Sequence, residues 1–302
     1  MTPPVWQVAA DDDGVRLARY VSDRSDAAFN QVKRWVGQGK VLVDGSAVTN
    51  PGARLLAGQT VTLRMNAPRA RDRSLDVDIV FEDAHVVVID KPAGISSVPY
   101  EKGERGTAMD AIRDAWKAQG KKSRGVPIHV VHRIDKATSG LLMFAKSKKA
   151  ELGLAKQLRE HALEREYRCV VHGQLDSRRI ESQLVRDRGD GLRGSDRRGT
   201  RGKRAVTHVE ALDKLAGATA CAVRLETGRT HQIRIHLAEA GHPLVGEKVY
   251  IRNYGGPVIE SPRLLLHAYS LGFEHPITGK QVSLRREPPK SFMAVVESLS
   301  DR

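Results

Sequence analysis

The segment from His132 to residue 145 constrains the fold of this chain more than any other. An apolar stretch ending at Val131 leads into a polar loop with Asp135 and the small residues 138–140, and residues 141–145 form a second apolar run. This order predicts a strand, an exposed loop that holds Asp135, and another strand. A carboxylate on a loop between rigid strands lies where catalytic groups are often found.

The rest of the chain from residue 76 onward mixes strand-like and helix-like patterns. Strands are predicted at 79–81, 86–89, 167–171 and 219–225, helices at 107–119, 148–163 and 231–239, and a hairpin over 268–285. These elements do not alternate regularly, which favours an α+β fold over a doubly wound parallel sheet. We therefore predict a mostly antiparallel mixed sheet with helices over residues 76–302.

The N-terminal part has a pattern of its own. Two short helices are predicted at 15–20 and 27–36, followed by a strand at 40–43, an Asp44-Gly45 turn and a strand at 61–63. This pattern predicts a small separate α/β module over residues 1–65. Residues 66–75 carry a proline and three arginines without apolar periodicity, which is typical of a basic linker.

The charge of the chain indicates a polyanionic partner. There are 50 Lys and Arg against 36 Asp and Glu, a formal net charge of +14, and such an excess most often serves nucleic acid. A membrane surface is the alternative that charge alone leaves open. No apolar run is long enough to span a bilayer and the N-terminus does not resemble a secretory signal, so we expect a cytoplasmic protein.

Cysteine and histidine spacing does not predict a metal site. Cys169 and Cys221 lie in apolar runs and are expected to be buried free thiols. Neither the pair His129 and His132 nor the pair His231 and His236 has the spacing of a zinc hydrolase or a third ligand nearby. We therefore expect no metal, and histidines that are structural or contact RNA.

Ordered motifs across residues 76–290 resemble the RluA-type RNA pseudouridine synthases. The segment 132–140 is similar to that family's His-Arg-Leu-Asp-x-x-Thr-Ser-Gly signature, with Ile134 in place of Leu. The other matches are Asp90-Lys91-Pro92-Ala93-Gly94, Tyr167, and residues 227–237 followed by 241–246. Glu166 departs from the family, which more often has Lys there.

The resemblance implies an enzyme that isomerises uridine to pseudouridine in structured RNA without a cofactor. It implies that Asp135 is the catalytic carboxylate, Arg229 its ion-pair partner, and Tyr167 a group that stacks on the uracil or takes a proton from carbon-5. It also implies that Arg133 enters the space of the flipped base. Further RNA contacts are expected from His132, Lys91 and Thr138.

The N-terminal module resembles the RNA-binding domain of ribosomal protein S-four. Matching positions include Arg16-Leu17, Arg34, Gly39 and Gly45, whereas Ala18 stands where that family usually has Asp. The resemblance implies that Arg16, Lys33 and Arg34 bind RNA. It favours large-subunit ribosomal RNA as the substrate of a monomeric enzyme. Transfer RNA is an alternative, as is a non-catalytic RNA-binding or ribosome-assembly protein; a metal-dependent hydrolase is disfavoured.

Residues 186–204 form an unusual basic segment. Eight Lys or Arg, three acids and five glycines occur in these nineteen residues. Arginine pairs well with phosphate and glycine permits close approach of a backbone. We expect a flexible insertion that contacts RNA, with a solvated loop as the alternative.

Overall fold

The computed structural model describes residues 3–67, 77–100, 104–121, 123–196 and 198–300. The chain divides into two compact units, Met1–Ser74 and Leu75–Arg302. Most of the predicted linker, residues 68–75, lies outside the described part. Each unit has a hydrophobic core of its own, so the two are described separately.

The first unit packs two helices on a small antiparallel sheet. The strand order is β1 (Val5–Gln7), β4 (Thr60–Leu63), β2 (Val41–Val43) and β3 (Ser46–Ala47). A 3-10 helix (Ala10–Asp12) precedes α1 (Leu17–Arg24) and α2 (Phe29–Gly37), which bury Leu17, Val21, Val32 and Val36. Asp44 and Gly45 both have positive φ, as a tight two-residue hairpin turn requires.

The second unit is built on a mixed sheet of eleven strands in its described part. The main path follows the order β11 (Gly194–Ser195), β10 (Arg178–Val185), β12 (Lys203–Leu215), β13 (Ala218–Leu225), β9 (Glu164–His172), β14 (Leu266–Glu274), β8 (Ser139–Ala145), β6 (Val86–Lys91) and β5 (Asp78–Glu82). The strands β7 (His129–Val130) and β15 (Gln281–Arg285) pair with β8 and β14. Within the described strands only β8 and β14 pair in parallel, so the predicted α+β class is confirmed.

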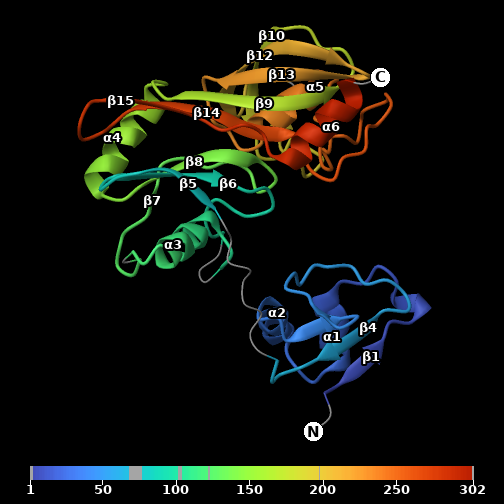
Figure 1. Cartoon of the computed structure of the whole chain (residues 1–302). Coiled ribbons are helices and arrows are strands. Elements are labelled where there is room, and N and C mark those ends of the chain that lie inside the picture. The colour runs from blue at the N-terminus through green and yellow to red at the C-terminus, as the bar shows by residue number, and fades with distance from the viewer. Residues whose placement is uncertain (1–2, 68–76, 101–103, 122, 197, 301–302) are drawn as a thin grey trace. The chain divides into compact units, whose positions relative to one another are not determined.

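Helices cover both faces of this sheet. The helices α3 (Ala108–Ala118) and α5 (Gln232–Glu239) pack on the face that carries Tyr167 and Cys169. The helices α4 (Lys148–Arg159) and α6 (Lys290–Ser300) pack on the other face of the sheet, against the strand residues that alternate with those of the first face. Figure 1 shows α3 beside β5 and β6, and α6 beside β9 and β14. The face under α5 is the one on which the cavity described below opens.

One glycine lets β8 and β14 pair closely. Gly140 has φ +108°, and a Cβ atom there would overlap the carbonyl oxygen of Ala268 on β14. Only glycine fits both the backbone angle and this close approach. Gly140 therefore fixes the C-terminal end of the Asp135 loop against the middle of the sheet.

Candidate active site

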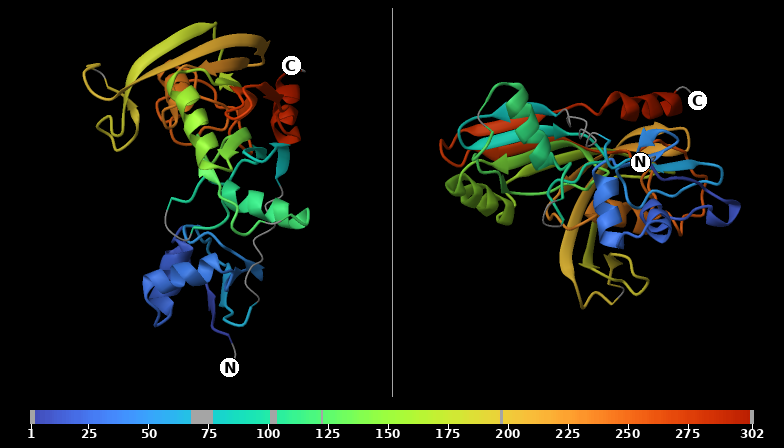
Figure 2. Two further views of the ribbon diagram at one scale, coloured as in Figure 1. Left: turned by 90° about the vertical axis from the view of Figure 1, so that its left-hand side faces the viewer. Right: turned by 90° about the horizontal axis from the view of Figure 1, so that it is seen from below.

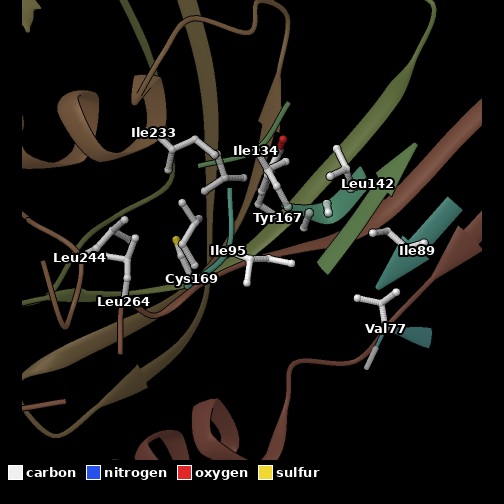
Figure 3. Packing of buried hydrophobic residues seen from close by; sticks show 14 of the residues in the cluster. Val77, Ile89, Ile95, Ile134, Leu142, Tyr167, Cys169, Ile233, Leu244 and Leu264 are labelled. Atoms are coloured by element: carbon white, nitrogen blue, oxygen red, sulfur yellow. The ribbon is translucent and has the colours of Figure 1, made fainter. Parts of the chain in front are cut away.

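A cavity of about 530 Å³ opens beside Asp135. Its walls come from the loop before β8, the end of α4, the start of β9, and the segment 225–233 that leads into α5. Segments far apart in the sequence therefore meet here. Figure 3 shows Ile134, Tyr167 and Ile233 along the upper part of the core cluster, and all three also line the cavity.

Main-chain hydrogen bonds hold the Asp135 loop in place. The Ser97 hydroxyl donates to the Ile134 carbonyl at 2.7 Å and lies 3.2 Å from the Ile134 amide nitrogen, which donates to it. The Thr138 amide donates to the Asp135 carbonyl at 3.0 Å. The Asp135 side chain keeps 17% of its surface exposed, so the carboxylate is fixed but can be reached from the cavity.

Two side chains of the α5 region face the Asp135 carboxylate. Arg234 Nη1 lies 3.7 Å from Oδ2, and His231 Nε2 lies 3.9 Å from Oδ1. Both distances exceed those of direct hydrogen bonds. The carboxylate therefore has a cation close enough to stabilise its charge and keeps its oxygens free for a substrate.

Glu247 holds Arg234 in a bidentate pair. Arg234 donates through Nε and Nη2 at 2.7 Å each, and the Glu247 side chain is fully buried. Burial opposes the charges of both groups, but their pairing outweighs it, so the pKa of Glu247 is lowered and that of Arg234 is raised. This pairing fixes the orientation of the guanidinium, whose Nη1 faces Asp135.

His231 has an unusual backbone and a tyrosine partner. It precedes α5 with φ +59°, a left-handed conformation that is uncommon for residues other than glycine. Its Nδ1 lies 2.7 Å from the Tyr250 hydroxyl. Burial lowers the pKa of His231 and raises the pKa of Tyr250 to about 12. A neutral imidazole that accepts from Tyr250 at Nδ1 would present its Nε2–H to Asp135.

Tyr167 forms part of the cavity wall next to Asp135. It lies on β9, opposite Val223 of β13, and is only 7% exposed. Burial raises the pKa of its phenol, so the group is neutral at physiological pH. Its ring is a rigid apolar surface at the cavity, with the hydroxyl protonated.

Comparison with known proteins identifies the family of proteins to which this chain is similar. Residues 85–239 match the family described as RNA pseudouridylate synthase. The chain is 37% identical to an uncharacterised RNA pseudouridine synthase YlyB of Bacillus subtilis, covering 92% of this chain and 91% of the relative. It is 36% identical to the ribosomal large subunit pseudouridine synthase D of Zymomonas mobilis, covering 98% of each.

This chain belongs to the RNA pseudouridylate synthase family. It is therefore a pseudouridine synthase, an isomerase. The solved structure of human RNA pseudouridylate synthase domain containing 4 has the same fold, with a TM-score of 0.59 at 22% identity, covering 73% of this chain and 92% of that one.

The structure corrects the expected ion pair between Asp135 and Arg229. Arg229 lines the cavity, but its Nε donates to the Arg204 carbonyl at 3.0 Å, and no ion pair joins it to Asp135 in the described structure. Arg229 precedes α5 and is exposed, whereas Arg234 lies within that helix, where residues 232–237 are all buried. An arginine flanked by Ile233 and Ile235 in an apolar helix was the sequence signal for the true partner.

Lys91 does not contact RNA as expected, because it is fully buried. Its Nζ donates to the carbonyls of Pro92 at 2.8 Å and Ile95 at 3.0 Å. Burial lowers the pKa of this lysine to about 7. Lys91 therefore braces the turn behind the Asp135 loop and offers no charge to a phosphate.

His132 is likewise structural rather than a cation for RNA. Its Nε2 accepts from the Met143 amide at 3.2 Å, which ties the loop to β8. Burial and the nearby Arg165 lower its pKa to about 3, so the ring stays neutral. Its side chain lines the cavity and can offer an apolar surface there.

Two further predicted residues lie at the cavity. Thr138 is 1% exposed, and its hydroxyl has no hydrogen-bond partner in the described part of the chain. Arg133 is exposed and donates from Nη2 to the Tyr100 hydroxyl at 2.6 Å, with its guanidinium 5.2 Å from the Tyr100 ring centroid. Asp135, Tyr167, Arg133 and Thr138 therefore share one cavity.

The remaining predicted residues belong to the first unit. Arg16 precedes α1, and Lys33 and Arg34 lie on α2; all three are exposed. Each adds a positive charge to the surface of that unit.

Within the described residues, the histidines and acids do not gather into a metal centre. Over the described ranges, no group of three or more His, Cys, Asp or Glu side chains is arranged to hold a metal ion. His236, one of the histidines considered above, instead bonds to Ser182 and Thr207. No helix in the described part is both long and apolar enough to cross a bilayer.

Proposed function

We propose that this synthase isomerises uridines in large-subunit ribosomal RNA and that Asp135 is its catalytic carboxylate. The observation that carries the proposal is the fixed, accessible carboxylate in a cavity opposite an anchored guanidinium. The ribosomal substrate is supported by relatives named ribosomal large subunit pseudouridine synthase D. An enzyme with this substrate would work in the cytoplasm, where ribosomes are assembled.

The reaction is an isomerisation that needs no oxidant or group donor. The bond from ribose carbon-1 to uracil nitrogen-1 breaks, and a bond from the same carbon to uracil carbon-5 forms. The proton on carbon-5 is lost and nitrogen-1 gains one, so atoms and charge balance. Asp135 would act beside the sugar and the base, and Arg234, 3.7 Å from it, would stabilise negative charge at this end of the cavity.

Tyr167 is proposed to stack on the flipped uracil. Its position in the wall near Asp135 and its burial support this role. The raised pKa of the phenol disfavours the alternative in which Tyr167 takes the carbon-5 proton, because a base must first be deprotonated. Stacking on an aromatic ring stabilises an unpaired base by about 1–3 kcal/mol.

Arg133 is proposed to occupy the space that the flipped uridine leaves. Its guanidinium is exposed at the cavity and is already stacked near an aromatic ring, that of Tyr100. A planar guanidinium can stack and donate several hydrogen bonds at once.

The first unit is proposed to be an S-four-like RNA-binding module, with residues 1–65 as the module and 76–302 as the catalytic domain. Its two helices on an antiparallel sheet and its exposed Arg16, Lys33 and Arg34 support this assignment. Such a surface would hold RNA through phosphates, without reading its sequence.

Mapping pseudouridines in RNA from cells with and without this gene tests the substrate. We expect one or a few pseudouridines of large-subunit ribosomal RNA to disappear and to return when the wild-type gene, but not its Asp135→Asn variant, is restored. Loss confined to transfer RNA would overturn the ribosomal assignment and keep the reaction.

A further inference from the structure

A second cavity, of about 460 Å³, adjoins the Asp135 cavity. The two share Gly228, Arg229 and Thr230, so they are separated only by the segment that leads into α5. The other walls come from the end of β10, the start of β12 and the connection between them. Figure 2 shows these two strands projecting from the body of the sheet.

Positive side chains dominate this second cavity. Arg186, Arg193, Lys203 and Arg229 line it, and no carboxylate is among its described lining residues. Four like charges around one cavity repel one another in the absence of an anion. The arrangement therefore favours the binding of a negatively charged group.

Ion pairing separates the cations of the 186–204 segment into two groups. Arg188 pairs with Asp190 at 2.9 Å, Arg201 with Asp196 at 3.3 Å, and Arg204 with Glu181 at 2.7 Å. Over the described residues, no ion pair involves Arg186, Arg193 or Lys203. The paired arginines fix the fold of the segment, and Arg186, Arg193 and Lys203 line the cavity. Arg198 also has no ion pair in the described structure, but it is exposed and lies outside the cavity lining.

The local backbone fixes the positions from which two of these cations, Arg186 and Lys203, extend. Gly202, which precedes Lys203, has φ +104°, and a Cβ atom there would lie 2.6 Å from the Leu184 carbonyl oxygen. The start of β12 therefore lies against the end of β10, which is followed by Arg186. Arg229 donates from Nε to the Arg204 carbonyl, which leaves its Nη groups directed to no partner in the described structure.

We propose that the second cavity binds phosphodiesters of the nucleotides that flank the target uridine, with Arg186, Arg193 and Lys203 as the phosphate ligands. Arg229 lies at the junction and would contact the phosphate nearest the flipped nucleotide. The inference rests on the proposed function, because it assumes that the uridine enters the Asp135 cavity. Arginine and lysine at fixed positions are suited to phosphate oxygens.

The test measures RNA binding and catalysis separately, with full-length protein and transcribed large-subunit ribosomal RNA. The variants are Arg186→Gln, Arg193→Gln, Lys203→Gln and the triple combination. The matched control is Arg201→Gln, which removes one positive charge from the same segment at a side chain that is 76% exposed and paired with Asp196. Thermal unfolding checks that every variant is folded.

A plot of the logarithm of the binding constant against the logarithm of the salt concentration has a negative slope, because binding releases counterions from the RNA. Each single variant should reduce the steepness of this slope by about 0.7, and the triple variant by about 2, because fewer counterions are released when a phosphate contact is lost. KM should rise at least about tenfold in the triple variant, while the single-turnover rate at saturating RNA stays unchanged. Arg201→Gln should behave as wild type.

Equal slopes in the triple variant and in Arg201→Gln would overturn the inference, whatever the catalytic rates. A wild-type protein that isomerises no uridine in any RNA would instead overturn the proposed function. Because binding is measured without turnover, the two failures are distinguishable.

Discussion

At the scale of single residues, the central feature is a carboxylate opposite an anchored guanidinium. The sequence motifs predicted Asp135, Tyr167 and Arg133 as site residues, and in the structure all three line one cavity. The partner of Asp135 was wrongly expected to be Arg229, although Arg234 stands between two isoleucines in an apolar helix, which indicated a buried arginine. Lys91 and His132 were misjudged because polar residues are usually exposed, whereas here main-chain partners keep them buried.

Arg234→Lys should lower the single-turnover rate at saturating RNA by at least about 100-fold. A lysine cannot hold Glu247 through two hydrogen bonds and face Asp135 as well. Arg229→Lys is the matched control and should cost the same rate less than about tenfold. A larger loss in Arg229→Lys than in Arg234→Lys would contradict the assignment of Arg234.

His132→Gln should make the protein more tolerant of acid. The pKa of His132 is about 3 in the fold and about 6.5 when unfolded. Below pH 6.5 His132 binds a proton in the unfolded chain but stays neutral in the folded chain, so the free energy of unfolding decreases as the pH is lowered. Between pH 7 and pH 5, wild type should lose about 2 kcal/mol more unfolding free energy than the variant. Urea unfolding at both pH values measures this, and equal losses would contradict it.

At the scale of elements, local sequence patterns predicted the helices α3 to α5 and most of the long strands of the second unit. The hairpin of β14 and β15 was predicted from its turn, and α5 from its spacing. The long strands β10 and β12 were not, because their exposed charges hide strand alternation. The segment between them was expected to be a flexible loop, yet it contains β11 and several ion pairs.

Gly140→Ala should destabilise the protein by about 3 kcal/mol or more, since it adds strain at positive φ to an overlap with the β14 backbone. Gly241→Ala is the control, because Gly241 also has positive φ but no atom lies within 4 Å of the place that a Cβ atom would take. That variant should lose only about 1 kcal/mol. Chemical denaturation compares the two, and similar losses would contradict the close approach of β8 and β14.

At the scale of the whole molecule, the α+β class and the existence of an N-terminal module with its own pattern could be read from the sequence. The sheet order could not, because β14 enters between β8 and β9 from about a hundred residues further along the chain. Such pairings depend on long-range packing and leave no local signal. The two units have separate cores, so substitutions on the surface of the first should leave the fold of the second intact.

The combined variant Arg16→Gln, Lys33→Gln and Arg34→Gln tests the first unit. All three side chains are exposed, so folding should be unaffected. RNA affinity should fall about tenfold or more at moderate salt, with a shallower salt dependence and an unchanged rate at saturation. Arg19→Gln is the control, because Arg19 already pairs with Asp23 at 2.9 Å. Wild-type affinity in the triple variant would argue against an RNA-binding role.

The most direct test of the account is tritium release from RNA labelled at uracil carbon-5, compared between wild type and Asp135→Asn. The substitution keeps the size of the side chain and removes its charge. Wild type should release tritium with no cofactor added, and the variant should be slower by at least about 1,000-fold while binding RNA with unchanged affinity. An Asp135→Asn variant within about tenfold of the wild-type rate would contradict the central claim that this carboxylate carries the reaction.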